Sequence, residues 1–167
     1  MLLLRKLLST TTRLDNGAIP ASEVQRGPAG QGSPSVAQVA ERDRLWADVA
    51  AHETAGRYSE ALAVIAQATA TSSSDPELLF ARASVLFAWG RFREARDVSL
   101  RAEAMGVRHA TLYLMLGWSC LATRDPAIAE TWMRKATIAE QADWKTHFGL
   151  AAALRAQKRF DEAIVAF

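Results

Sequence analysis

The sequence predicts an all-α fold in which helix-turn-helix units stack into a solenoid. From Arg42 onward the chain repeats every 34 residues without an insertion or deletion. A period of this length is typical of solenoids, whose units cannot bury their apolar faces alone. Alanines mark the register at positions 61, 95, 129 and 163, and again at 68, 102 and 136. The composition agrees, because 50% of the residues are hydrophobic, 23% are charged and only 9 of 167 are glycine.

The first unit, residues 42–75, contains two predicted helices that meet at Gly56. Ser33 and Pro34 cap the leading helix, which we expect to begin several residues before Arg42. The predicted inward face of each helix is marked by residues three or four positions apart. These are Leu45, Val49 and His52 before the turn, and Ala61, Ile65 and Ala68 after it.

The second unit, residues 76–109, carries the clearest helix signals. Asp75 is an N-cap carboxylate, and Pro76 occupies the first helical position, where its missing N–H costs nothing. Gly90 ends this helix, and residues 92–104 form the next one. The predicted inward positions are Leu79, Ala83 and Leu86, followed by Ala95, Val98 and Ala102. Small residues recur where two helices must approach closely, which explains the spacing of the alanines.

The third and fourth units, residues 110–143 and 144–167, vary the turn. In the third, Asp125 and Pro126 replace the glycine and serve as cap and first position of the second helix. In the fourth, residues 158–160 form the turn. The pattern stops inside the last helix without a polar capping unit, so we expect this chain to be part of a longer protein.

This pattern resembles the tetratricopeptide repeat, whose 34-residue signature is W-x2-L-G-x2-Y, then A-x3-F, then P. The third unit matches best, at Tyr113, Leu116, Gly117, Cys120, Ala129 and Met133. The fourth unit matches at Leu150, Ala151, Leu154, Ala163 and Phe167. The resemblance covers residues 42–167 and implies a right-handed superhelix of about 3.7 repeats, truncated at its C-terminus.

The chain departs from the family signature in two ways. The closing proline is absent from each complete repeat, where Ser73, Val107 and Gln141 stand instead. The first two repeats also replace the Leu-Gly pair, by Asp48-Val49 and Arg82-Ala83. No single match is specific, but four repeats in one unbroken register are.

Residues 1–34 are predicted to be a flexible leader before a repeat domain at residues 35–167. Residues 16–34 are rich in Gly, Pro, Ser and Gln. Residues 1–14 are apolar and basic, with three cations and no acid before Asp15. Arg5 and Lys6 interrupt the apolar stretch too early for a secretory signal. The segment is predicted to be a short helix or a disordered start, with an organelle presequence as the alternative.

The sequence contains no pattern for catalysis or metal binding. The three histidines, His52, His109 and His147, do not stand three or four residues from one another or from Cys120, as metal ligands on one helix would. By the resemblance, His52 and Cys120 take core positions, which implies a packed, hydrogen-bonded imidazole and a buried, inert thiol. No phosphate-binding or nucleophile-elbow motif occurs. We therefore expect no cofactor, no metal and no catalysis from these residues.

Charge and hydropathy limit the classes of partner that the chain can bind. Binding to a phosphate backbone needs a concentrated positive charge, and the net charge of this chain is only +2. A nucleic acid is therefore not expected as a partner. No apolar run approaches the 18 residues that a membrane-spanning helix needs. The single cysteine excludes an intramolecular disulfide. We expect a cytoplasmic, bacterial protein, with targeting by residues 1–14 as the minor alternative.

The resemblance implies that the first helix of each repeat lines a concave groove in which ligand peptides lie. Transferred by register, the predicted groove residues are Trp46, Phe80, Ser84, Phe87, Leu114, Met115, Trp118, Leu121, Phe148 and Arg155. Such an apolar, aromatic groove suits an amphipathic helix or an extended apolar peptide. The alternative is that several of these residues, Phe80 and Phe148 above all, pack against the neighbouring repeat as core.

One known use of the family is excluded by the residues present. A carboxylate clamp for acidic C-terminal peptides needs Lys, Asn and Arg, whereas the corresponding positions hold Trp46, Ala50, Ala81, Thr111 and Met115. None of these side chains donates charge-assisted hydrogen bonds. Base-by-base reading of RNA is also disfavoured, because polar base-reading side chains are missing.

Two functions follow from these observations. The first is a non-catalytic scaffold that binds a peptide or partner helix in the apolar groove, with the open C-terminal repeat as a route to self-association. The alternative is the N-terminal repeat region of a larger enzyme, of the glycosyltransferase or sulfotransferase type, whose catalytic domain lies beyond residue 167. The sequence past Phe167 would discriminate between them.

Overall fold

The structure is a computed structural model that describes residues 36–71, 75–139 and 143–166. Those residues form helices and turns without a strand, which confirms the predicted all-α class. The helices are α2 (Val36–Thr54), α3 (Tyr58–Thr71), α4 (Pro76–Trp89), α5 (Phe92–Ala104), α6 (Ala110–Ala122), α7 (Pro126–Thr137), α8 (Trp144–Ala156) and α9 (Phe160–Val165). The predicted leader and its cap at Ser33 and Pro34 lie outside the described residues.

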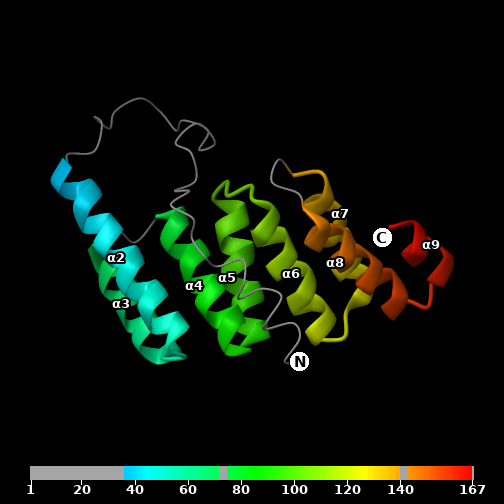
Figure 1. Ribbon diagram of the computed structural model, residues 1–167, viewed down its shortest axis with the longest axis horizontal. Coiled ribbons are helices and arrows are strands. Elements are labelled where there is room, and N and C mark those ends of the chain that lie inside the picture. The colour runs from blue at the N-terminus through cyan, green and yellow to red at the C-terminus, as the bar shows by residue number, and fades with distance from the viewer. Residues whose placement is uncertain (1–35, 72–74, 140–142, 167) are drawn as a thin grey trace.

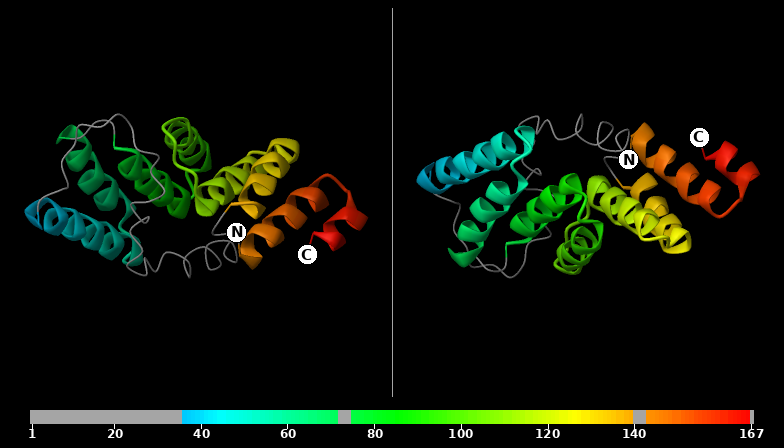
Figure 2. Two further views of the ribbon diagram at one scale, coloured as in Figure 1. Left: turned by 90° about the horizontal axis from the view of Figure 1, so that it is seen from above. Right: turned by 90° about the horizontal axis from the view of Figure 1, so that it is seen from below.

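The helices pair in sequence order and stack along the long axis of the molecule (Figure 1). Each pair, α2–α3, α4–α5, α6–α7 and α8–α9, is one predicted unit, and each packs on the next. The stack curves, so that both of its ends bend toward the same side (Figure 2). This arrangement confirms the predicted solenoid. The expectation that the first helix begins before Arg42 is also confirmed, because α2 already includes Val36.

The turn inside each unit repeats the same backbone geometry. One residue just after each first helix has a positive φ: 72° at Gly56, 86° at Gly90, 65° at Arg124 and 64° at Lys158. The next residue then donates its N–H to the carbonyl oxygen five residues earlier. These bonds join Arg57 to His52 (2.8 Å), Arg91 to Leu86 (2.9 Å), Asp125 to Cys120 (2.9 Å) and Arg159 to Leu154 (3.1 Å). This is the Schellman-type helix end that glycine normally favours.

The helix starts match the sequence with one exception. The Asp75 carboxylate accepts a hydrogen bond from the Glu77 N–H at 2.9 Å, and Pro76 opens α4, as predicted. Pro126 likewise opens α7, but the Asp125 side chain makes no capping hydrogen bond, so that part of the prediction is wrong. Asp125 has a φ of −120° and a ψ of 67°, because its N–H closes the preceding turn. Its backbone is therefore not extended as at Asp75.

The spaced alanines lie where the helices approach most closely. Ala61, Ala95 and Ala129 are 0% exposed, as are Ala102 and Ala136. Met133 makes a comparable close contact between repeats. A Cβ atom added at Gly117 or at Gly149 would lie 2.6 Å from an atom of the Met133 side chain. The two glycines therefore let α6 and α8 approach the same methionine from opposite sides.

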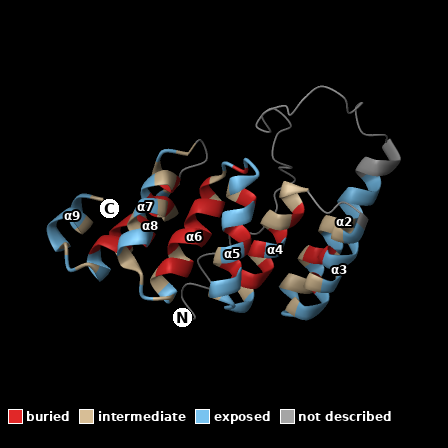
Figure 3. Cartoon of the chain, turned by 180° about the vertical axis from the view of Figure 1, so that it is seen from behind, coloured by how far each residue is buried: buried red, intermediate tan, exposed pale blue. Residues whose placement is uncertain are grey.

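The apolar core consists of two groups of side chains that meet at α4. Val49, Ala61, Ile65, Ala81 and Val85 form the smaller group, between α2, α3 and α4. The larger group runs from α4 to α8. Buried residues accordingly concentrate in α4, α6 and α8, while α2 and α3 are mostly half-buried or exposed (Figure 3).

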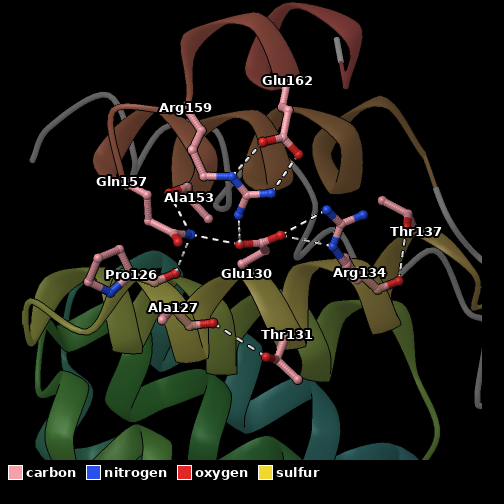
Figure 4. Close-up of polar contacts among 10 residues, drawn as sticks. All are labelled: Pro126, Ala127, Glu130, Thr131, Arg134, Thr137, Ala153, Gln157, Arg159 and Glu162. Atoms are coloured by element: carbon pink, nitrogen blue, oxygen red, sulfur yellow. Dashed lines mark hydrogen bonds and ion pairs between the residues drawn. The ribbon is translucent and has the colours of Figure 1, made fainter.

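A polar network joins the last two units on the outside of the core (Figure 4). The Glu130 carboxylate, only 14% exposed, accepts hydrogen bonds from Arg134 (2.8 Å), Gln157 (2.8 Å) and Arg159 (2.6 Å). Arg159 also pairs with Glu162 of α9. Burial opposes ionisation of Glu130, but these hydrogen bonds and the two cations outweigh it and lower the pKa of the carboxyl. The network therefore fixes α7 to both helices of the next unit.

Replacement of Arg124 or Lys158 by glycine should raise the free energy of unfolding by about 0.5–1 kcal/mol, because glycine adopts a positive φ without steric cost. Urea denaturation measures this change. Gly90→Ala is the matched control and should lower the stability by a similar amount. Nothing lies within 4 Å of a Cβ at Gly90, so only the backbone conformation would be responsible. Destabilisation by Arg124→Gly would contradict this account of the turns.

Ala129→Leu should lower the free energy of unfolding by about 1–3 kcal/mol, because the larger side chain overpacks a fully buried site. Ala95→Leu should behave alike. Ala127→Leu, on the exposed side of the same helix, is the control and should shift stability by less than about 0.5 kcal/mol. If Ala129→Leu left the denaturation midpoint unchanged, the assigned register would be wrong.

Candidate functional site

The first helices of the units form the inner layer of the curved stack. α4 packs directly on α6, and α6 on α8. No packing of that extent joins α3 to α5 or α5 to α7 among the described helices. Helices on the inside of a curve lie closer to their counterparts than those on the outside. α4, α6 and α8 therefore lie on the concave side of the stack, where the sequence places its candidate site, and α2 is the corresponding first helix of the first unit.

Three of the predicted groove residues are core residues. Phe87 is 7% exposed, Leu114 4% and Met115 3%. Phe87 packs edge-on against Phe92 across the turn, with ring centroids 5.3 Å apart. Leu114 reaches α8, where its Cδ2 atom lies 3.2 Å from the position of a Cβ at Gly149. Neighbouring helices cover these three side chains, so the groove positions predicted for them leave little surface for a ligand.

The other predicted groove residues keep part of their surface. Arg155 is exposed, and the half-buried ones are Trp46, Phe80, Ser84, Trp118, Leu121 and Phe148. Phe80 and Phe148 are therefore neither fully exposed groove residues nor fully buried core residues, which were the two alternatives from the sequence. Phe80 contacts His109 of the next turn, with centroids 5.6 Å apart, and Trp46 packs against the smaller core group.

Three aromatic rings meet on the inner face of α6 and α8. The Phe148 ring lies 5.9 Å from that of Trp118 and 6.5 Å from that of Trp144, measured between centroids. Trp144 is 58% exposed, which makes it the most accessible of the three rings. Trp118, Phe148 and Trp144 are called the aromatic cluster below. Such a cluster offers a large, rigid apolar surface on two helices that also pack on each other.

Trp144 was missed by the sequence analysis, although a signal was available. Groove positions were transferred from the family register, in which Trp144 is the first residue of its repeat and falls outside the expected lining. It stands four residues before Phe148 on α8, however, and side chains four apart share a helix face. A search for aromatic pairs at that spacing would have found it.

An unusual carboxyl group lies in the first unit. Glu53, near the end of α2, has a buried Oε1 atom with no hydrogen-bond partner in the described part of the chain. Glu77 of α4, by contrast, is paired with Arg42. Burial raises the pKa of Glu53 to about 7. Among the described residues, no hydrogen bond to the Oε1 atom offsets the free-energy cost of burying the ionised Glu53 carboxylate.

The histidines and the cysteine do not come together. His52 is half-buried, and its Nδ1 atom has no hydrogen-bond partner among the residues that the structure describes, so the predicted hydrogen bond is absent there at that atom. His109 caps α6 by accepting the Thr111 N–H at 3.1 Å, and His147 is exposed. Cys120 is buried as expected, and burial raises the pKa of its thiol. No group of three or more His, Cys, Asp or Glu side chains is placed to hold a metal within the described ranges.

A comparison with protein-family profiles identifies the repeats. The tetratricopeptide repeat profile matches residues 50–106, 80–143 and 114–167, overlapping matches that together cover more than half of the chain. The chain belongs to the tetratricopeptide repeat family. No curated protein sequence matches it.

Solved structures share this tetratricopeptide repeat fold. YrrB, described as a tetratricopeptide repeat protein with an unusual peptide-binding site, superposes with a TM-score of 0.64 at 18% identity, over 81% of this chain and 72% of its own. A structure described as MamA MSR-1 C2 gives a TM-score of 0.60 at 25% identity, over 79% and 74%. The type III secretion translocator chaperone SycD from Yersinia enterocolitica gives 0.56 at 17%, over 83% and 97%.

Glu53→Gln should stabilise the tetratricopeptide repeat domain at pH 8. Because the folded-state pKa of about 7 exceeds the ordinary 4.5, folding takes up a proton between these values. The wild type therefore loses stability as the pH rises through that window. The glutamine stays neutral, so its advantage should be roughly 1–3 kcal/mol at pH 8 and several-fold smaller at pH 5.

Urea denaturation at the two pH values measures this difference. Glu41→Gln, which changes an exposed glutamate of the same helix, is the control and should give no pH-dependent gain. An equal gain from Glu53→Gln at pH 5 and at pH 8 would mean that the carboxyl is not held in an unfavourable site.

Proposed function

We propose that this domain is a non-catalytic cytoplasmic scaffold that binds a peptide or partner helix against the aromatic cluster of its inner face. One observation carries the proposal: Trp144, 58% exposed, completes a three-ring surface on α6 and α8. Tryptophan is over-represented among the residues that dominate binding energy at protein interfaces.

The chemistry of the site selects the kind of partner. The cluster presents apolar ring faces, and the clamp positions Trp46, Ala50 and Ala81 offer no cation to a carboxylate. A partner would therefore bind through apolar anchors, such as one face of an amphipathic helix. Affinity gained in this way changes little with salt, because apolar burial is not screened.

The nature of the structural neighbours supports this proposal. YrrB is described by its peptide-binding site, and SycD is described as a chaperone for secretion translocators. None of the described helices is long and apolar enough to span a membrane. The alternative that these repeats precede a catalytic domain stays a prediction, as does self-association through the last repeat.

Trp144→Ala should weaken peptide binding by roughly 2 kcal/mol or more if the ring is an anchor, while the fold persists because the ring is mainly exposed. The probes are peptides selected by display on the wild-type protein, with affinity measured by calorimetry in low and high salt. Trp118→Ala should also weaken binding, but with some loss of stability, since Trp118 packs partly on the core.

Trp89→Ala is the matched control, because Trp89 lies at the end of α4 and stacks on Tyr58 instead of joining the aromatic cluster. It should leave affinity unchanged. Binding that falls steeply with salt, or that survives both cluster substitutions, would rule out the aromatic cluster as the binding site.

A further inference from the structure

The inner helices of the last two units are free of acidic residues and end in cations. Neither α6 nor α8 contains an aspartate or a glutamate. Arg124 stands two residues beyond α6, Arg155 lies in the last turn of α8, and Lys158 stands two residues beyond α8. All three side chains are exposed. Arg124, Arg155 and Lys158 are called the basic end below.

The cations of the basic end lie on adjacent turns. Gln157, next to Lys158, donates a hydrogen bond from its Nε2 atom to the carbonyl oxygen of Pro126 at 3.2 Å. Pro126 stands two residues after Arg124, and α6 packs directly on α8. Both helices therefore end at the same edge of the stack (Figure 1). A ligand that lies across the two helix ends meets all three cations.

The acidic side chains at this edge do not neutralise the basic end. None of its three cations forms an ion pair with a described residue. Glu130 and Glu162 pair with Arg159 instead. Asp125 and Asp161 lie at the starts of the outer helices α7 and α9. The inner side of this edge is therefore positive, which favours a negatively charged group on the ligand.

Two of the three cations occupy a backbone conformation that favours glycine. The corresponding turns of the first two units use Gly56 and Gly90, whereas Arg124 and Lys158 adopt φ values of 65° and 64°. A side chain in this left-handed region lowers stability, and residues held in this way concentrate at binding sites. No ion pair with a described residue offsets that loss, so a role in binding explains these cations better than a role in folding.

The basic end lies beyond the aromatic cluster along α8. Arg155 stands seven residues after Phe148 and eleven after Trp144. At 3.6 residues per turn these three side chains lie within about 40° of one another around the helix, and Arg155 lies about 10 Å beyond Phe148 along it. A ligand helix beside α8 has the same rise. A carboxylate about seven residues from the apolar residue that contacts Phe148 therefore reaches Arg155.

We propose that the partner of this domain carries acidic residues at one end of its apolar segment, which bind the basic end while the apolar residues bind the aromatic cluster. This inference rests on the proposed function, because it names the chemistry of the ligand for the same surface. The basic end lies outside the positions of the carboxylate clamp. Exposed ion pairs are weak and are screened by salt, so the apolar contacts supply most of the affinity. The basic end selects acidic ligands and fixes the direction in which they lie.

Display selection on two versions of the protein tests the chemistry of the ligand. The variant Arg124→Gly/Arg155→Gln/Lys158→Gly removes the three charges, and its two glycines suit the left-handed turns, so its fold should persist. Peptides selected on the wild type should be enriched in Asp or Glu about seven residues from a large apolar residue. Peptides selected on the variant should show no such enrichment. Equal enrichment on both proteins, or none on either, would overturn the proposal.

A binding cycle then measures the contact between the acids and the basic end. The probes are one peptide selected on the wild type and its copy with glutamine in place of each acid, with affinities measured by calorimetry. The wild type should bind the acidic peptide about three- to tenfold more tightly in low salt, and within about twofold of the neutral copy in about 1 M NaCl. The triple variant should bind both peptides alike. A preference that persists in the variant would contradict the assigned contact.

Two further variants are the controls. Arg124→Lys/Lys158→Arg keeps both charges and should keep the preference for the acidic peptide. Arg93→Gln removes an exposed cation of the outer helix α5 and should leave the preference unchanged. A purely structural role of the basic end would alter the denaturation midpoint but not the preference between the peptides. If an oligodeoxythymidine displaced the peptide from the wild type but not from the triple variant, the ligand would be a phosphate backbone and the proposal would be wrong.

The two hypotheses fail separately in these experiments. If the selected peptides lose affinity with Trp144→Ala but show no preference for acids, the scaffold function stands and the basic end plays no part. If they depend on the basic end but bind Trp144→Ala as tightly as the wild type, the charge contact stands and the aromatic cluster is not the anchor. A domain that selects no peptide at all would overturn both.

Discussion

The close approach of helices at the buried alanines is the constraint on which the rest of this molecule depends. Ala61, Ala95 and Ala129 have no exposed surface, and each lies in the second helix of its unit, against the first. A unit of two helices has too little apolar surface to fold alone, so it is stable only when the next unit covers it. The small side chains fix how near the helices lie, and the left-handed turns fix how they are joined.

The same packing creates the candidate site. Met133 fits between Gly117 of α6 and Gly149 of α8, and this contact draws the two inner helices together. Trp118 and Phe148, one on each helix, then lie within ring-contact distance. The aromatic surface is thus a product of the inter-repeat contact, and it would be lost if the repeats were spaced further apart. A binding surface of this kind is rigid before the ligand arrives, which reduces the entropy lost on binding.

The fold could be predicted from the sequence because the same 34-residue helix-turn-helix pattern recurs in one register. The site could be predicted only in part, because a register says which helix face a residue occupies but not how much the neighbouring unit covers it. Phe87 and Met115 were expected to be accessible and are core residues, whereas Trp144 was missed. Arg124 and Lys158 gave no sign of their positive φ, since neither is the glycine that usually marks it. The sequence also could not predict that the Glu53 Oε1 atom is buried without a hydrogen-bond partner among the described residues, because burial depends on the assembled helices.

The division of the core at α4 bears on how the molecule loses structure. Ala81 and Val85 face the small group shared with α2 and α3, whereas Ala83 and Leu86 face the large group that continues to α8. We therefore expect the first repeat to unfold locally while the remaining repeats keep their own contacts. Its amides would exchange with solvent through this partial opening, long before those of α6 and α7, which are released only by global unfolding. The chain would then behave as two cooperative units that are joined through α4 and through Leu62 of α3, which packs against both groups.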